Sequence, residues 1–372
     1  MPKKITYLLG AGASAYSIPM MRALPKSMKY FFRKLCHFLK EDEEFNEDID
    51  SCKATYDRLL DEIEQFGTPD IVAKALTLRD DPNHEIWRLK NLLTCFMIAE
   101  QFKPDLVHGI DSFLNEEDLK ELKKDIFEDD EDLTRHIFSE TLDNRYIEFF
   151  SSVLQGKRGS LYLPHDINII SWNYDHQIEK ALSVFSQEGQ VKLQFNFGVF
   201  PRTDKSYYHE SVNGLKPTMG RYRIIKLNGT AGIANDKNPD NSTFDFIYHS
   251  LDKTALRMMG KRLFTSRQMS GELNHLTFAW DESVASVVAR ETAAELISES
   301  DVLVVIGYSF PTFNRLIDRQ LFKNFQGNKV YVQDPSADEL ILKLDGVKAD
   351  LKEKVAVKSK GEFIIPNEYW EN

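Results

Sequence analysis

The chain has 372 residues, of which 42% are hydrophobic and 12% aromatic, so it exceeds one ordinary domain in length and can bury a large core. Its formal charge of −11 at pH 7 disfavours direct binding to a polyanion such as DNA. No window approaches 18 uninterrupted apolar residues, and the amino terminus leads into an expected strand rather than a signal peptide, so we expect a cytoplasmic protein without a membrane span.

The first apolar run, Ile5–Leu9, ends abruptly in Gly10-Ala11-Gly12-Ala13-Ser14. This pattern predicts a strand followed by a tight turn. Because glycine lacks Cβ, such a turn can bring backbone N–H groups close to a pyrophosphate, and a dinucleotide is the expected ligand. The pattern is short, and a tight turn without a ligand fits it equally well.

The segment after the glycines differs from that of dehydrogenases, in which a second strand ends in a carboxylate about 20 residues later. Here residues 30–35 read Tyr-Phe-Phe-Arg-Lys-Leu, and apolar residues recur at helical spacing. The expected apolar face holds Met28, Phe31, Phe32, Leu35, Phe38 and Leu39, with Lys29, Arg33, Lys34 and Lys40 off it. A helical insertion over residues 26–160 therefore delays the second strand, which argues against ordinary hydride-transfer enzymes.

Four further strand signals follow, and each ends in small or polar residues. The strands are expected at Ile167–Ile170, Arg223–Leu227, Val302–Ile306 and Val330–Val332. They run into Ser171-Trp172-Asn173-Tyr174-Asp175, Asn228-Gly229-Thr230, Gly307-Tyr308-Ser309 and Gln333-Asp334. In open α/β sheets ligands bind at the carboxyl ends of strands, so these polar residues are candidate site residues.

Helical spacing predicts two helices after these strands. One presents Ile178, Ala181, Leu182 and Phe185 on one face, and the other presents Phe313, Leu316, Ile317, Gln320 and Leu321. His176 begins the first of these helices and is expected at the surface, so we set it aside as a base. Acidic loops are expected at residues 41–50 and 128–132, a turn-rich loop at 235–243 and a basic-faced helix at 251–263.

Together, the glycine turn with the following Ser17-Ile18-Pro19-Met20-Met21-Arg22 and the strand-end motifs resemble the sirtuin-like fold family over about residues 1–25, 161–234 and 285–340. The chain is most similar to the prokaryotic sirtuin-like NAD hydrolases of antiviral defence, which share the Gly-Tyr-Ser strand end and large helical insertions. The resemblance implies an α/β fold: a Rossmann-like parallel sheet with helices on both faces. The NAD-binding domain would comprise residues 1–25 and 161–372, with a smaller insertion at about 235–284, and residues 26–160 would form the helical insertion.

The resemblance also implies roles for individual residues. Gly10, Ala11, Gly12 and Ser14 would contact the phosphates and ribose of NAD, and Arg22 would lie on a mobile cofactor loop. Asn173 and Asp175 would surround the nicotinamide ribose and amide, Ser309 and Asp334 would serve the adenosine half, and Gly307 would also bind the cofactor. The implied reaction is hydrolysis of NAD to nicotinamide and ADP-ribose, with Asn173 positioning the water or ribose hydroxyls and Asp175 holding the ribose or carboxamide.

One position departs from the family pattern. Asn228 stands where the family has a histidine that acts as general base. An amide cannot take up a proton at neutral pH, and general-base help is worth about 10²–10⁴-fold, so the sequence predicts a slow or silent enzyme. A natural variant with another base and an engineered substitution that traps NAD both fit this pattern.

Three cysteines, Cys36, Cys52 and Cys95, supply neither a disulfide framework nor paired zinc ligands. Protein-deacylating sirtuins generally carry a zinc ribbon, so water is the expected acceptor and no zinc is expected. The resemblance further implies a homo-oligomer that docks onto a HerA-type ATPase. Two alternatives stay open: a non-catalytic sensor of NAD or ADP-ribose, and an NAD-dependent deacylase or ADP-ribosyltransferase.

Overall fold

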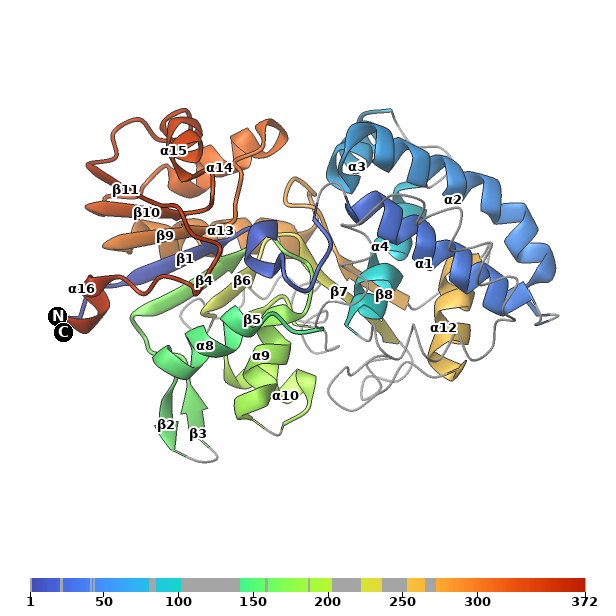
Figure 1. Cartoon of the computed structure of the whole chain (residues 1–372), viewed down its shortest axis with the longest axis horizontal. Coiled ribbons are helices and arrows are strands. Elements are labelled where there is room, and N and C mark those ends of the chain that lie inside the picture. Colours follow the sequence, from blue (N-terminus) through green and yellow to red (C-terminus); the bar gives the residue numbers. More distant parts are fainter. Residues whose placement is uncertain are drawn as a thin grey trace. The chain divides into compact units, whose positions relative to one another are not determined.

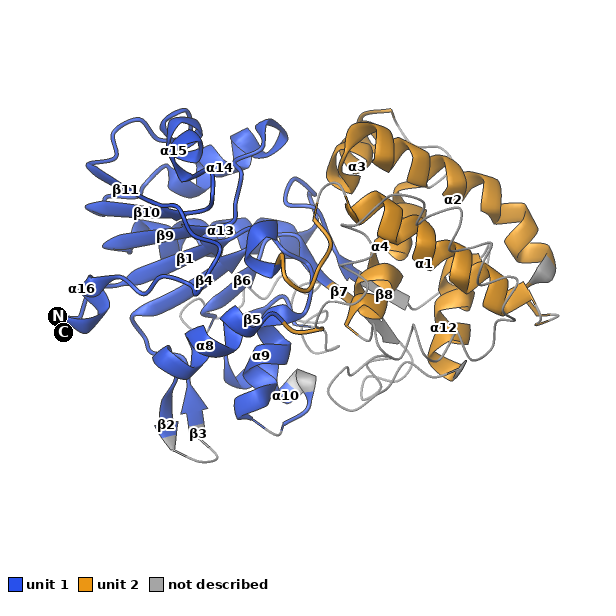
Figure 2. Ribbon diagram, viewed as in Figure 1, with its two compact units in different colours: residues 1–14, 143–230, 275–372 blue, residues 15–142, 231–274 orange. Residues whose placement is uncertain are grey.

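The computed structural model describes residues 2–20, 23–40, 42, 44–79, 85–101, 141–157, 160–186, 188–202, 222–235, 253–264 and 272–371. The chain forms two compact units (Figure 2). Unit 1 comprises Met1–Ser14, Asp143–Thr230 and His275–Asn372, and unit 2 comprises Ala15–Leu142 and Ala231–Asn274.

Unit 1 is built on a seven-stranded sheet in the order β11-β10-β9-β1-β4-β6-β5, and its paired strands are parallel (Figure 1). The strands are β1 (Ile5–Leu9), β4 (Ile167–Ser171), β5 (Val199–Phe200), β6 (Ile224–Lys226), β9 (Val302–Ile306), β10 (Lys329–Gln333) and β11 (Glu353–Val357). Apart from the edge strand β5, this is the 3-2-1-4-5-6 order of Rossmann folds, with the switch point between β1 and β9. The predicted Rossmann-like α/β fold is confirmed.

The central strands β1, β4, β6 and β9 are buried along their whole length because both faces of the sheet are covered. On one face, Leu8, Ile170 and Leu303 pack with Ala289 and Ala293 of α13 (Val284–Ser298). The same core includes residues of α14 (Arg315–Phe322) and α15 (Ala337–Asp345).

The other face packs against α8 (Asn144–Val153). The ring of Tyr7 in β1 meets that of Phe149 edge-on, with centroids 4.8 Å apart. The remaining elements of unit 1 are the hairpin of β2 (Gln155–Lys157) and β3 (Ser160–Tyr162), the helices α9 (Gln177–Phe185), α10 (Gln190–Asn196) and α16 (Asn367–Trp370), and the short 3₁₀ helices η1 (Ala11–Ser14) and η2 (Thr312–Asn314). A separate two-stranded sheet joins β7 (Gly229–Asn235) and β8 (Glu272–Leu276).

Unit 2 holds the helices α1 (Ala23–Lys40), α2 (Asn46–Phe66), α3 (Pro69–Leu78), α4 (Glu85–Glu100) and α12 (Lys253–Phe264). Phe32 and Tyr56 pack with ring centroids 5.0 Å apart, and the Tyr56 hydroxyl donates to the Leu263 carbonyl at 2.7 Å. These contacts join α1, α2 and α12 in one core. Helices α1–α4 follow β1 in the chain, as the sequence predicts.

Several local predictions were wrong. Lys34, expected off the apolar face of its helix, is fully buried, with its ammonium group 4.7 Å from the Tyr30 ring centre. The acidic segment expected as a loop over 41–50 enters α2 at Asn46, where Glu47 and Asp48 suit a helix amino terminus. Leu316, expected on the apolar face of α14, is 74% exposed, whereas Asp318 on the same helix is buried.

The unit boundaries also differ from the expected domain boundaries. Residues 15–25 belong to unit 2, and α8, expected within the insertion, belongs to unit 1. Arg22, the acidic loop at 128–132 and most of the turn-rich loop at 235–243 lie outside the described residues. Among the residues that the structure describes, no helix has the length and apolar character needed to cross a membrane.

Candidate functional site

The glycine turn lies at the carboxyl end of β1, beside the end of β9. The Gly10 N–H donates to the Ile306 carbonyl and the Gly12 N–H to the Gly307 carbonyl, both at 2.9 Å. The turn therefore sits at the switch point of the sheet, where open α/β folds bind ligands. Both of these N–H groups donate within the protein, so a phosphate group on this turn would need other donors as well.

Close packing explains why this turn contains glycine. A Cβ added to Gly10 would lie 2.5 Å from the Gly307 carbonyl oxygen, and one added to Gly12 would lie 2.7 Å from the Gly307 Cα. Gly307 itself has φ 60°, and its Cβ would lie 2.5 Å from the Ala13 nitrogen. The ends of β1 and β9 thus pack backbone against backbone, and side chains at these positions would force them apart.

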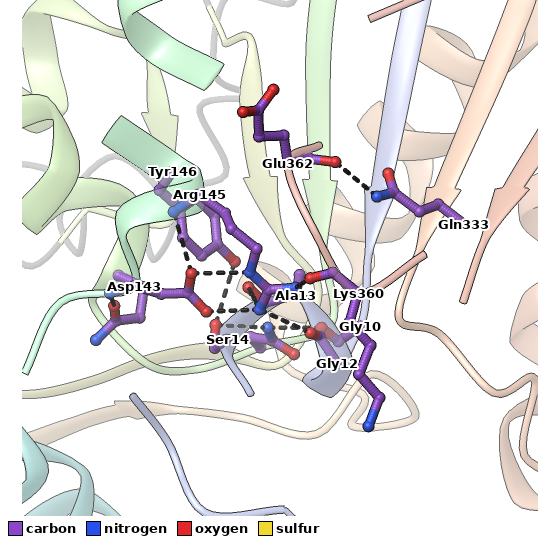
Figure 3. A network of polar contacts seen from close by, with 12 residues as sticks. Gly10, Gly12, Ala13, Ser14, Asp143, Arg145, Tyr146, Gln333, Lys360 and Glu362 are labelled. Carbon is purple, nitrogen blue, oxygen red and sulfur yellow. Dashed lines mark hydrogen bonds and ion pairs between the residues drawn. The ribbon is translucent and has the colours of Figure 1, made fainter. Parts of the chain in front are cut away.

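Arg145, at the start of α8, fixes the carbonyl side of the turn (Figure 3). Its Nη2 donates to the carbonyls of Gly12 and Ala13 at 3.1 Å each and to Asp143 at 2.6 Å. Its Nη1 donates to the Lys360 carbonyl at 3.1 Å. Sequence reasoning missed Arg145, although Asp143 before an apolar helical segment is a recognisable N-cap signal for α8.

A cluster of polar side chains surrounds the turn. The Asn173 Nδ2, after β4, donates to the Gly10 carbonyl at 2.9 Å and to Ser14 Oγ at 3.2 Å. Ser14 Oγ lies 3.1 Å from the Tyr146 hydroxyl, and the Ser14 side chain also lowers the pKa of Asp175. The structure therefore brings together Gly10, Ser14, Asn173 and Asp175 as expected, and adds Tyr146.

Asp175 is the acidic member of this cluster and is only 6% exposed. Its Oδ1 accepts from the Gln177 N–H at 2.9 Å at the start of α9. Burial raises the pKa of Asp175, and the Lys226 ammonium group and the Gln177 N–H only partly offset this effect. Burial and the negative charge of Asp175 hold the pKa of Tyr146 well above its usual range. A buried carboxyl with a raised pKa at a strand end is a candidate acid or base.

Asn228 follows β6 and has a buried side chain with both ends of its amide in use. Its Nδ2 donates to the Trp172 carbonyl at 2.8 Å, and its Oδ1 accepts from the Ala279 N–H at 2.9 Å. An amide provides the donor and the acceptor that these two backbone groups require. Asn228 therefore has a structural role, because it ties the end of β4 to the segment after β8.

The other predicted site residues lie at neighbouring strand ends. Ala11 is exposed on η1. Ser309 is exposed after β9, and its carbonyl accepts from Lys343 at 3.3 Å. Asp334 follows β10 and accepts from the Ser336 N–H at 2.8 Å, before α15. The Ser309 carbonyl and the Asp334 side chain thus bond toward α15 rather than toward Ser14. Arg22 lies outside the described residues.

His176, expected at the surface, is instead buried at the start of α9. Its Nδ1 is 4.0 Å from Glu179 Oε1. The cysteines Cys36, Cys52 and Cys95 are buried free thiols. Within the described ranges, no three His, Cys, Asp or Glu side chains are grouped as a metal site would require.

Comparison of the chain with models of known protein families gave no match, and a search of curated proteins gave none either.

Proposed function

We propose that this chain binds NAD at the carboxyl ends of β1 and β4 and hydrolyses it to nicotinamide and ADP-ribose. The observation that carries the proposal is the cluster of Ser14, Asn173 and Asp175 on the glycine turn at the switch point of the sheet. Dinucleotides bind at this position in Rossmann folds. The sirtuin-like resemblance of the strand-end motifs supports the same ligand.

The reaction suits these side chains. Water attacks C1′ of the nicotinamide ribose, the N-glycosidic bond breaks with its electron pair leaving on nicotinamide, and a proton of the water passes to a base. Because the pyridinium becomes neutral as it leaves, the protein has mainly to hold the ribose and stabilise the positive charge that develops on it. Asn173 and Ser14 offer polar partners for ribose hydroxyls, and the Asp175 carboxylate offers negative charge.

Proton removal falls to Asp175 in this proposal. Asn228 cannot accept a proton, and both ends of its amide are bonded to backbone groups. Burial raises the pKa of Asp175, which makes its carboxylate a better proton acceptor than an exposed aspartate. We expect turnover about 10²–10⁴-fold below that of a site with a well-placed imidazole base.

Binding of NAD or ADP-ribose without turnover is the second candidate. It is favoured by the bonding of Asn228, because that residue occupies the base position of the family pattern in a purely structural role. In this case the chain would report the level of the nucleotide to a partner.

The biological setting rests on the resemblance alone. We propose a cytoplasmic homo-oligomer that depletes NAD during antiphage defence, with a HerA-type ATPase as its partner.

Two measurements test the function: titration calorimetry with NAD and with ADP-ribose, and chromatographic assay of released nicotinamide. We expect the wild type to bind NAD and release nicotinamide slowly. Asp175→Asn should keep NAD affinity within a few-fold and lose release. Asp301→Asn is a matched control, because Asp301 accepts from the Lys4 N–H at the amino end of the sheet, and it should behave as wild type.

Tight NAD binding with no nicotinamide release from the wild type would select the sensor function. Absence of binding to both nucleotides at millimolar concentration would refute both candidates.

A further inference from the structure

A buried ion pair lies directly behind Asp175. Lys226 Nζ, from β6, is 3.2 Å from Glu179 Oε1, on α9, and both side chains are at most 1% exposed. Gln194 Nε2 also donates to Glu179 Oε1 at 3.2 Å. The carboxylate of the pair is thus held from two sides inside the protein.

The ammonium group of Lys226 reaches beyond its ion pair. It also donates to the Asp175 backbone carbonyl and, at 2.8 Å, to Thr230 Oγ1. Lys226 therefore connects β6, α9 and the residue that carries the carboxyl of the candidate site. Buried ion pairs seldom add stability over well-packed apolar residues, so this arrangement calls for a role other than stability.

We infer that Lys226, held in place by Glu179, is a positioning residue for Asp175: its ammonium group fixes the Asp175 carbonyl, so that the carboxyl stays between Ser14 and the start of α9. The inference rests on the proposed function, in which Asp175 is the proton acceptor. It deepens that function by naming the group that sets the position and charge of the acceptor.

The charges that face Asp175 come from three elements. Lys226 on β6 lowers the pKa of Asp175 and Glu179 on α9 raises it, whereas the charge of Asp175 raises the pKa of Tyr146 on α8. Lys226 acts more strongly than Glu179. Removal of Lys226 and removal of Glu179 should therefore shift the titration of Asp175 in opposite directions.

The test follows the carboxyl of Asp175 by ¹³C NMR of protein labelled at the aspartate side-chain carboxyl, with the signal assigned by its loss in Asp175→Asn. We expect Glu179→Gln to lower the titration midpoint. Lys226→Met should raise it by about one pH unit or more, the scale of a close opposite charge. Because Lys226→Met leaves Glu179 buried and unpaired, the double variant Lys226→Met/Glu179→Gln provides the same test without an unpaired charge, and it should also raise the midpoint.

The matched control is Lys4→Met/Glu299→Gln, which removes an exposed pair of the same kind, with a 2.7 Å separation, at the amino end of the sheet. It should leave the midpoint of Asp175 unchanged. Nicotinamide release, measured in parallel, should fall at least several-fold in the double variant at Lys226 and Glu179 and stay constant in the control.

An Asp175 midpoint that is the same in wild type, Glu179→Gln and the double variant would overturn the inference. The titration needs no ligand, so it remains decisive if the wild type fails to bind NAD, a result that would refute the proposed function alone.

Discussion

The Asn173 side chain, at the end of β4, donates to the Gly10 carbonyl, at the end of β1, at 2.9 Å. The two residues are 163 positions apart in the chain. Their contact lets one amide couple the second strand-end motif to the glycine turn, and it also orients the Nδ2 group toward Ser14 at 3.2 Å. Any ligand on this turn would lie next to an amide that the turn itself holds in place.

Asn173→Ala should lower the free energy of unfolding by about 1–2 kcal/mol, because the Gly10 carbonyl and Ser14 lose a donor. NAD affinity should fall more than ten-fold. Urea unfolding and calorimetry measure the two effects. Asn328→Ala is the control at an exposed position before β10 and should change stability by less than about 0.5 kcal/mol. Equal NAD affinity in both variants would show that Asn173 does not contribute to NAD binding.

Arg145→Met should destabilise the protein by about 3–5 kcal/mol. The substitution leaves Asp143 buried without its cation and frees the carbonyls of Gly12 and Ala13. Arg319→Met is the control, because Arg319 donates to the Gly346 carbonyl at the surface. Denaturant midpoints that fall equally in the two variants would show that Arg145 does not fix the turn.

Gly307→Ala separates packing from backbone strain. Gly307 (φ 60°) and Gly67 (φ 79°) both have left-handed backbones, but a Cβ at 67 meets nothing within 4 Å. Gly67→Ala should cost about 1–2 kcal/mol from strain alone. Gly307→Ala should cost clearly more, because its Cβ would press on the turn. Thermal unfolding of both variants measures these costs. Similar losses of stability in the two variants would contradict the tight packing of the ends of β1 and β9.

Asp318 should make stability depend on pH. Burial raises the pKa of Asp318 to about 7. A hydrogen bond from the Tyr308 hydroxyl at 2.8 Å lowers the pKa, but this effect is smaller than that of burial. The folded state therefore binds this proton more tightly than the unfolded state, whose carboxyl has a pKa near 3.8. The stabilisation is present below about pH 4 and is lost as the pH rises to about 7, at up to about 1.4 kcal/mol per pH unit.

Asp318→Asn should remove this dependence. Urea unfolding from pH 4 to 8 would show it as a flatter profile than that of the wild type. Profiles of identical slope would mean that Asp318 is already ionised in the folded protein at low pH.

The sequence predicts the sheet well where strands are short apolar runs. The expected strands over Ile5–Leu9 and Val302–Ile306 match β1 and β9 to the residue. The strand β11 was not predicted from the sequence because it lacks an apolar run: at its outer position in the sheet, Glu353 and Lys354 are at least partly exposed. The strand β5 was not predicted because it has only two residues.

The site was predictable only in part. Strand-end motifs point to Ser14, Asn173 and Asp175 because parallel strands end at one edge of the sheet. The partners of Asn228 lie 56 and 51 residues away, and Arg145 is more than 130 residues from the turn that it binds. Such pairings follow from tertiary packing, and no local pattern encodes them.

A crystal structure with NAD bound tests the central claim most directly. We predict density for the pyrophosphate over Gly10–Ser14, with the nicotinamide ribose toward Asn173 and Asp175. Density for NAD elsewhere on the protein, or an empty site in crystals soaked well above the affinity measured in solution, would contradict it.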